Sequence, residues 1–222
     1  PPKGKTLNEY TWEEIDYISS NGLAGEYGFQ VGDAKAITLN GTVGSLTLDN
    51  YQTYAYIIGI NHNTALEGNN LIHFQFAKTA LSGGTDVCLV DGSYISMGSS
   101  AAFRMNTSDT NSGGWKDSYM RNNICGTSKT STSGRIMGAI PADLRNVLKS
   151  VTKYTNKGGS GSSSSVVTAT TDYFFLLSEY EVFGSITHSS TYEANYQQQY
   201  AYYSAGNSKV KYRHNSTGSA AH

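Results

Sequence analysis

The sequence predicts an α+β fold in a single domain spanning residues 1–222. Helical patterns at residues 11–22, 116–125 and 140–150 alternate with short runs that have the pattern of strands, and this mixed order is typical of α+β proteins. A chain of 222 residues can bury roughly 70% of the surface that it would expose when extended, so it can form its own core.

The first helix is predicted by a start, an apolar face and a stop. Thr11 is a suitable N-cap, and Glu14 follows three residues later, as in a capping box. Gly22 is expected to end the helix. The apolar face consists of Trp12, Ile15 and Ile18.

A β-hairpin is predicted next. Apolar residues alternate on both sides of Asn40-Gly41, a pair typical of tight turns, and Gly44 is expected to be an irregularity. Residues 54–60 are apolar on both faces, which indicates a buried strand, and residues 71–76 alternate again.

The stretch 106–124 is predicted to join a loop to a helix. Gly113 and Gly114 let the backbone turn closely beneath a large ring, and Trp115 is expected to pack on the core. These three residues are therefore assigned structural roles.

Within helix 116–125, each side chain has an expected direction. Asp117 should lie near the N-terminus, where a carboxylate is favoured by free amides and the dipole. Met120 and Ile124 should face inward, whereas Arg121 should point to solvent or to a neighbouring carboxylate.

The second half of the chain alternates helix, loop and strand. Residues 140–150 are predicted to be helical, starting with Pro141 in the first turn. The run 157–165, rich in Gly and Ser, is expected to be an exposed, flexible hairpin loop. An engineered linker would have the same composition. Residues 166–177 are predicted to continue as a strand.

A stripe of tyrosines follows at helical spacing. Tyr192, Tyr196, Tyr200 and Tyr203 recur along one predicted face, and Gly206 stands where a C-terminal cap would lie. Such rings usually pack on a sheet, so Tyr196 and Tyr200 are expected to be structural. A ligand-binding platform is the alternative. The residues that could face a ligand are Tyr192, Tyr202 and His62.

Composition and charge exclude some classes of partner. The formal net charge is −1 and the sixteen Lys and Arg residues are scattered, so the chain lacks the basic stripe that nucleic acids or anionic membranes require. No stretch is apolar enough to predict a membrane span. Seventeen Tyr residues, with abundant Gly, Ser, Thr and Asn, suit polar recognition, although Tyr is also a common strand residue.

Common catalytic motifs are missing from the sequence. No HExxH, GxSxG, phosphate loop or GxGxxG occurs, and the histidines lack ligand spacing. Glu179 and Glu181 would share a strand face about 7 Å apart, which an inverting glycosidase could use, but this spacing is also a common accident. Cys88 and Cys125 allow one disulfide at most. The sequence is compatible with a disulfide between them and with two free, buried thiols. No catalytic residue is therefore assigned.

One pattern resembles the start of a calcium loop. Asp109, Asn111 and Gly114 match D-x-N-x-x-G, which places oxygen ligands before a tight turn. The twelfth position is Met120 instead of Glu, so an EF-hand is excluded. No cofactor is expected, with another kind of Ca²⁺ site as the alternative.

Several strings together resemble an uncharacterised domain family of bacterial surface proteins and phage-encoded proteins. That family is similar to the C-type-lectin-like fold of formylglycine-generating-enzyme-like domains and of the variable proteins of diversity-generating retroelements. The strings cover nearly the whole chain, and they are TWEEIDYIS, GFQVGDAKAITLNG, GINHN, TNSGGWKDSYMR, IPADLRNVLKSVTKYT, VTATTDYFFLLSEYEVFG and YEANYQQQYAYYSAGNSKVKYR.

The resemblance implies twisted antiparallel sheets with a few flanking helices and a non-enzymatic recognition or adhesion function. It implies an extracellular location, on a bacterial surface or a phage tail, and a protein or glycan receptor as partner. A structural component of a virion or surface assembly is the alternative, and a glycosidase using Glu179 and Glu181 is a third. Oxidase activity is not implied, because Cys88 and Cys125 lie outside the matching positions.

The resemblance also implies that a C-terminal tract is missing. Family members continue past KVKYRHNSTGSAA with a Trp-rich tract and closing strands, whereas this chain ends at His222. We therefore expect a groove near the C-terminal end that is exposed or filled by a partner chain, since an unpaired sheet edge invites pairing.

Overall fold

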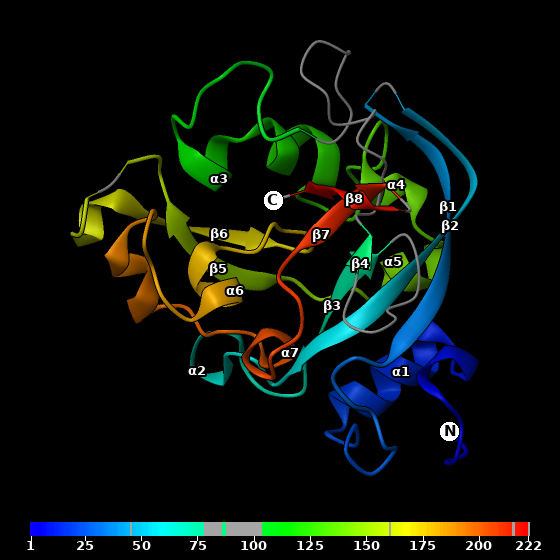
Figure 1. The fold of residues 1–222 in the computed structure, drawn as a ribbon. Helices are drawn as coiled ribbons and strands as arrows, with labels where there is room; N and C mark the ends of the chain where they lie inside the picture. The colour runs from blue at the N-terminus through cyan, green and yellow to red at the C-terminus, as the bar shows by residue number, and fades with distance from the viewer. Residues whose placement is uncertain (45, 78–85, 88–103, 160, 215, 222) are drawn as a thin grey trace.

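The computed structural model describes residues 1–44, 46–77, 86–87, 104–159, 161–214 and 216–221, with the backbone alone for 86–87 and 211–221 (Figure 1). Within these residues, short helices lie among three small sheets. The predicted α+β class is therefore confirmed. No helix of the described residues is long and apolar enough to cross a membrane.

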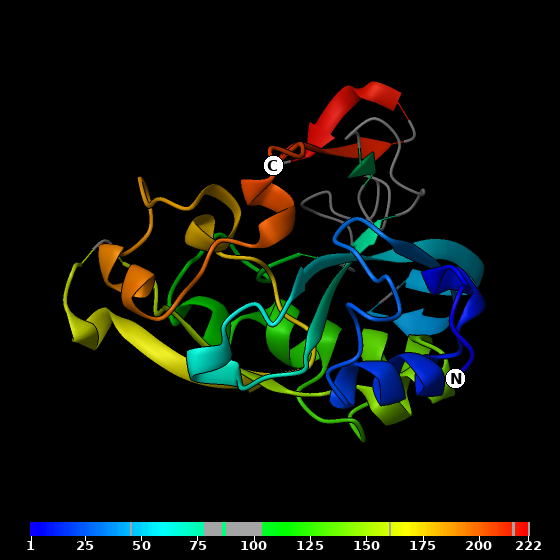
Figure 2. The ribbon, with the colours of Figure 1, turned by 90° about the horizontal axis from the view of Figure 1, so that it is seen from below.

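The largest sheet is antiparallel, in the order β1-β2-β3. Its strands are β1 (Ala34–Val43), β2 (Leu46–Ile60) and β3 (Ile72–Ala77). The predicted buried strand at 54–60 lies within β2, where Ala55 to Ile58 are buried. In Figure 2 this sheet lies between the β7–β8 hairpin on one side and α4 and α5 on the other.

The predicted turn at Asn40-Gly41 is wrong. The β1–β2 pairing continues to Val43, with a register shift between Leu39 and Gly41, and the chain reverses only after Val43. Leu39 and Val43 are both fully buried, so the core holds the first strand in place beyond the expected turn. Gly44, with φ of +59°, belongs to the reversal, and Gly41 is the irregularity.

The first predicted helix is confirmed as α1 (Trp12–Ser20). Thr11 Oγ1 accepts a hydrogen bond from the Glu14 amide at 3.1 Å, and the Glu14 carboxylate accepts one from the Thr11 amide at 3.0 Å. Its apolar residues Trp12, Ile15 and Ile18 are buried. The helix packs against α5 (Ala142–Val147). The helix predicted at 140–150 is therefore shorter than expected, and Pro141 is its N-cap instead of a residue of its first turn.

The second sheet is the hairpin of β5 (Val151–Asn156) and β6 (Val167–Asp172). The predicted hairpin loop, 157–165, lies between these strands, and its described residues are exposed. The predicted strand at 166–177 ends early, at Asp172. Residues 173–177 leave the hairpin and run beside β3 (Figures 1 and 2).

The helix predicted at 116–125 is broken in two. It consists of α3 (Gly114–Asp117) and a π-helical turn, η3 (Met120–Cys125). Ser118 is extended between them, and its hydroxyl donates to the Trp115 carbonyl at 2.8 Å and accepts from the Arg121 amide at 3.1 Å. Asp117 is consequently the last residue of α3 and not at the start of a longer helix.

Gly114 is required where this joint meets β5. Its φ is +59°, and a Cβ there would lie 1.8 Å from the Asn156 carbonyl oxygen. Gly114→Ala is therefore expected to lower the free energy of unfolding by roughly 2 kcal/mol or more. Gly134→Ala is the matched control, because Gly134 has φ of +69° and no atom within 4 Å of that Cβ. Equal losses in urea denaturation would contradict the clash.

The continuous tyrosine helix is also wrong. After α6 (Glu179–Phe183), the tyrosine segment consists of a 3-10 turn, η5 (Thr191–Asn195), a loop, and the short helix α7 (Ala201–Ser204). Tyr200 is extended, which interrupts the helical path. The side chain of Gln197 holds the intervening loop. Its Nε2 donates to the Tyr154 carbonyl at 2.7 Å, and its Oε1 accepts from the Ser178 hydroxyl at 2.8 Å.

The remaining elements are short. They are η1 (Leu7–Glu9), α2 (Thr64–Glu67), β4 (Asp86–Val87), α4 (Ile136–Ala139), η4 (Ser164–Val166), β7 (Lys211–His214) and β8 (Ser216–Ala221). The C-terminal strands form a third sheet, in which β7 pairs in parallel with β4 and antiparallel with β8.

Candidate functional site

A cavity of about 590 Å³ lies between β3 and the segment 173–177, which bends at Tyr173 and Phe174 after β6 and forms no helix or strand. We call it the slot. Every residue from Asn70 to Phe76 and every residue from Tyr173 to Leu177 lines it. Neighbouring side chains of a strand point to opposite faces, so the consecutive lining run of β3 places part of the slot along the edge of that strand. The slot also extends beneath the core face of the sheet, where Ile37 and Ala55 line it.

Both edges lack backbone partners within the described part of the chain. β3 pairs with β2 on one side, and no backbone hydrogen bond joins its other edge to a described residue. The amides and carbonyls of residues 173–177 likewise make none with described residues. Such groups are normally paired when they are shielded from water.

The slot has apolar walls and reaches the surface. Phe74 packs edge-on against Trp12, with ring centroids 5.5 Å apart, and the Phe76 and Phe174 rings lie 6.1 Å apart. Leu176 is 48% exposed and Met105 is 38% exposed, so the lining extends to solvent. An apolar cavity with a few polar groups is the usual form of a binding site.

Cys125 also lines the slot but is not a reactive thiol. It is free and buried, and burial raises its pKa to about 12. Since the thiolate is the nucleophile and metal ligand, Cys125 is suited to packing. Its predicted companion Cys88 lies outside the described residues.

A buried polar cluster adjoins the slot through His73, which belongs to both. The histidine, lysine and glutamate side chains among its members are 1% to 5% exposed. They come from six separate segments of the chain. The members are His62, Glu67, His73, Lys153, Glu181 and Tyr200.

Lys153 lies at the centre of the buried polar cluster. Its ammonium contacts the Glu181 carboxylate directly and lies 3.8 Å from Glu67 Oε1. His73 Nε2 lies 2.9 Å from Glu67 Oε2, and His73 Nδ1 lies 2.9 Å from the Tyr200 hydroxyl. Neither Glu67 oxygen has hydrogen-bond geometry with a described residue, so Glu67 is held by close polar contacts. Buried charges are costly unless paired, and this network pairs them.

His62 is part of this cluster and does not face a ligand. Its ring stacks on Tyr200, with centroids 3.6 Å apart and planes 6° apart. Burial first, and then the electrostatic influence of His73 and Lys153, lower the pKa of His62 to about 3. His62 is therefore neutral at pH 7, and its 3.8 Å approach to Glu181 is not an ion pair.

The stability of the protein should depend on pH through His62. The ordinary pKa of 6.5 applies in the unfolded chain, and the folded value is about 3. Between these values the unfolded chain binds a proton that the folded chain does not. The contribution of neutral His62 is thus present above about pH 6.5 and lost as the pH falls, at up to about 1.4 kcal/mol per pH unit.

Urea denaturation between pH 7 and pH 4 measures this effect in the wild type and in His62→Phe, which keeps a ring on Tyr200. The charged or titratable groups around His62 are common to both proteins, and they are Glu67, His73, Lys153, Glu181 and Tyr200. The variant should lose less stability than the wild type as the pH falls. Parallel curves for the two proteins would contradict the assignment.

The predicted carboxylate pair does not share a strand face, because residues 179–183 form helix α6. Glu181 is buried against Lys153. Glu179 instead accepts hydrogen bonds from the amides of Thr187, His188 and Ser189 at 2.7 to 3.1 Å. Burial opposes the shift, but these bonds lower the pKa of Glu179. Each carboxylate thus holds its own part of the fold.

The predicted ligand-facing tyrosines have different surroundings. Tyr202 is 2% exposed and packs between Tyr56 and Tyr203, so the expectation that it faces a ligand is wrong. Tyr192 is half-buried and contacts Tyr196, whose ring stacks on Tyr154 with centroids 4.2 Å apart. Tyr200 is fully buried, as expected of a structural ring.

The joint at 106–124 is tied to the second sheet. Trp115 is buried, and its Nε1 donates to Asp172 Oδ2 at 2.9 Å. Arg121 Nε donates to Asp172 Oδ1 at 2.8 Å, so the predicted carboxylate neighbour of Arg121 is Asp172. Met120 and Ile124 are buried, as predicted.

The calcium pattern is not gathered into a ligand set. Asp109 and Asn111 are exposed, and Gly113 and Gly114 have φ of +78° and +59°. Among the described residues, no group of three or more His, Cys, Asp or Glu side chains is placed to hold a metal ion.

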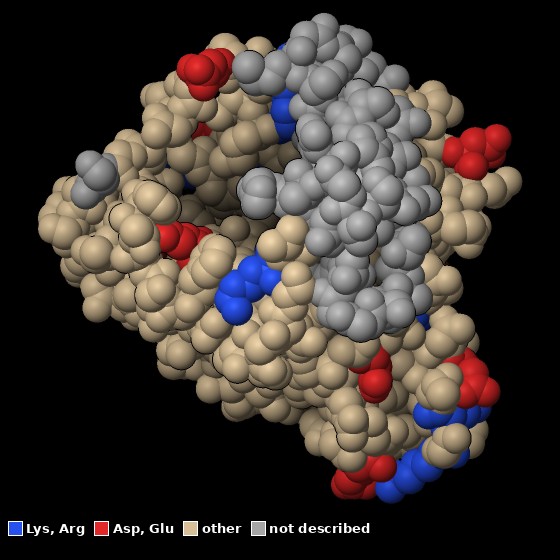
Figure 3. Space-filling view, in the orientation of Figure 1, with Lys and Arg blue, Asp and Glu red and all other residues tan. Residues whose placement is uncertain are grey.

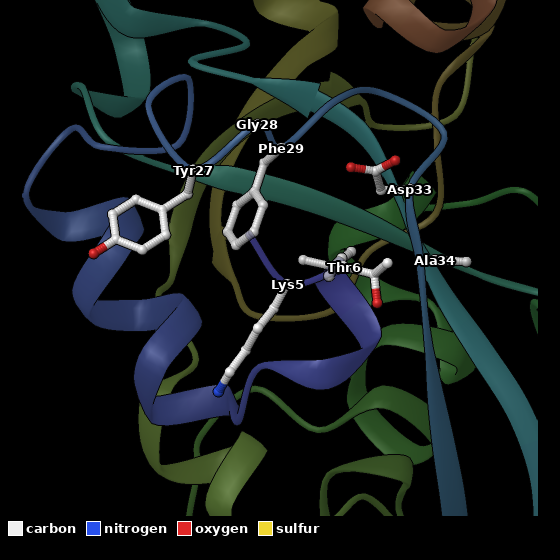
Figure 4. A pocket seen from close by; sticks show the side chains of 8 residues that line it. Lys5, Thr6, Tyr27, Gly28, Phe29, Asp33 and Ala34 are labelled. Carbon is white, nitrogen blue, oxygen red and sulfur yellow. The ribbon is translucent and has the colours of Figure 1, made fainter. Parts of the chain in front are cut away.

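A smaller cavity, of about 330 Å³, lies near the N-terminus (Figure 4). Its lining combines Lys5 and Thr6 with Tyr27, Phe29 and Asp33.

On the face shown in Figure 3, the surface is hollowed between the regions of α3 and α6, and residues other than Lys, Arg, Asp and Glu form most of the visible wall. Neither feature gathers a set of catalytic groups among the described residues.

The sequence reasoning missed the slot and most of the buried polar cluster. Lys153 gave one available sign, because it stands between Val151 and Thr155 at a position of β5 that alternation places inward. Comparison of the chain with protein-family models, with curated proteins and with solved structures returned no match. The site is therefore interpreted from its own geometry.

Proposed function

We propose that this chain is a non-enzymatic recognition module of C-type-lectin-like build, displayed on a bacterial surface or a phage tail, which binds a protein on another cell. The observation that carries the proposal is the slot. It combines apolar walls, a volume of about 590 Å³ and access to solvent, and such cavities are the default binding sites of proteins.

A protein receptor is favoured over a glycan by the lining of the slot. Phe74, Phe76 and Phe174 form much of its wall, together with aliphatic side chains from the core. The charged residues at its rim, Asp16 and Lys149, are 3.0 Å apart and neutralise each other. A sugar would bring many hydroxyl groups into a space with few side-chain partners, and unpaired polar groups are costly to bury.

A non-enzymatic role is favoured by the state of the titratable groups. Glu181 and Lys153 are almost completely buried and contact each other, so a substrate cannot reach either group in this arrangement. Glu179 is occupied by backbone amides. General acid–base catalysis needs a group within hydrogen-bond reach of the substrate, and neither carboxylate offers this.

Binding of the fluorescently labelled chain to a panel of bacterial cells tests the proposal. Cells are compared before and after digestion of surface proteins with proteinase K, and before and after periodate oxidation of surface glycans. We expect saturable binding that proteinase K removes and periodate spares. Loss after periodate alone would show a glycan receptor, and self-association without cell binding would favour an assembly role.

Two variants connect cell binding to the slot. Ala55 lines the slot and is 4% exposed, so Ala55→Phe places a ring inside it. Ala169 is an exposed residue of β6 outside the slot, and Ala169→Phe is the matched control. Ala55→Phe should abolish cell binding, and Ala169→Phe should retain it.

A further inference from the structure

We infer that the slot takes an extended strand of the partner protein, which pairs with β3 on one side and with residues 173–177 on the other. The inference rests on the proposed function and names the chemistry of the partner. A guest strand would join the β1-β2-β3 sheet to the β5-β6 hairpin, because segment 173–177 continues directly from β6. Strand addition to an exposed sheet edge is a recurring mode of peptide recognition.

The unpaired backbone selects this occupant over a small apolar molecule. Both edges of the slot carry amides and carbonyls without backbone partners among the described residues. An alkyl chain or aromatic ligand would fill the volume but leave these groups unsatisfied in a dry environment. An extended peptide satisfies both edges at once, because its own amides and carbonyls alternate between its two sides.

The slot also specifies the pattern of the guest. Phe74 and Phe76 belong to the core face of β3 with Trp12, as the cross-strand partners Ile57 and Ala55 show. The opposite face carries His73 and Gln75, whose side chains contact the hydroxyl groups of Tyr200 and Tyr203. A guest strand should therefore alternate, with apolar residues beside Phe74 and Phe76 and polar residues beside His73 and Gln75.

The guest should be short and uncharged. β3 is six residues long, and five residues line the opposite edge, so five to seven guest residues match the slot. The paired Asp16 and Lys149 at the rim present no net charge to attract a charged segment. The probe chosen for the test is the fluorescein-labelled peptide GTVTVTVTG, which alternates Thr and Val and carries no charged side chain.

Fluorescence anisotropy measures binding of this probe to the full chain. Two further peptides carry N-methyl groups on the three Val amides or on the Thr amides at the three matching positions, which removes the donors of one edge at a time. We expect saturable binding by the unmodified probe and a loss of at least about tenfold for each methylated peptide, since both edges pair. The block peptide GVVVTTTTG, of the same composition, should bind at least about tenfold more weakly.

The slot variants complete the design. Ala55→Phe should lose binding of the probe and Ala169→Phe should keep it. Circular dichroism melts check that both variants fold, and Ala55→Leu replaces Ala55→Phe if the larger ring unfolds the chain. Dodecanoate is tested in parallel as a small apolar occupant, and size-exclusion chromatography tests a second copy of the chain.

Three outcomes overturn the inference. If the wild type binds dodecanoate but not the probe, and Ala55→Phe loses dodecanoate binding, the slot is a small-molecule site. A dimer lost in Ala55→Phe would make it a self-association site, and binding of no probe would mean that it is closed. Cell binding separates the two proposals. If Ala55→Phe loses cell binding but the probe never binds, recognition stands and strand addition fails. If Ala55→Phe loses binding of the probe but keeps cell binding, strand addition stands and the receptor binds elsewhere on the chain.

Discussion

Replacing Lys153 with Met is expected to lower the free energy of unfolding by about 3 to 5 kcal/mol, the usual loss when one partner of a buried ion pair is removed. The ammonium contacts Glu181 and lies 3.8 Å from Glu67 Oε1, and both carboxylates are 1% to 2% exposed. Without Lys153, two carboxylates remain buried close to the same point. Urea denaturation at pH 7 measures the loss.

Two variants test that the loss comes from unpaired charge. Lys149→Met removes an ammonium that is 50% exposed and 3.0 Å from Asp16, and it should cost under about 1 kcal/mol. Glu181→Gln, added to Lys153→Met, should recover part of the stability because it removes one buried charge. A loss for Lys153→Met that is no larger than that for Lys149→Met would show that the cluster is not a stabilising network.

Replacing Trp115 with Ala is expected to cost about 3 to 5 kcal/mol, as other large core truncations do. The ring is 6% exposed, and its Nε1 donates to the buried Asp172. The truncation leaves a cavity beneath the joint and removes one donor from a carboxylate that is almost fully enclosed. Thermal and urea denaturation give the change in stability.

Trp115→Phe separates packing from hydrogen bonding. It retains an aromatic ring but not the Nε1 donor, so it should cost about 1 to 3 kcal/mol. Asp172 keeps its bonds from Arg121 Nε at 2.8 Å and Thr170 Oγ1 at 2.5 Å, which limits the loss. Unchanged stability in Trp115→Ala would overturn the structural role and point to a role in binding.

Predictions from sequence succeeded where the interacting residues are close in the chain. The cap formed by Thr11 and Glu14 is built by groups three residues apart, so its pattern is complete within one turn. They failed where distant packing chose between local options. No turn forms at Asn40-Gly41, because burial of Val43 favours a longer strand. The tyrosine segment does not form one helix, because Tyr200 is buried in an extended conformation.

The sequence by itself determined the α+β class, the first helix, the strand at 54–60 and the inward position of Trp115, because cap residues and apolar periodicity express those features locally. Only the tertiary structure decided the site. The slot joins β3 to a segment about a hundred residues later, and Lys153 meets Glu67 and Glu181 from elements far along the chain in both directions. A sequence pattern records which residues are polar or apolar, but the approach of distant backbones decides which edges stay unpaired and which charges meet.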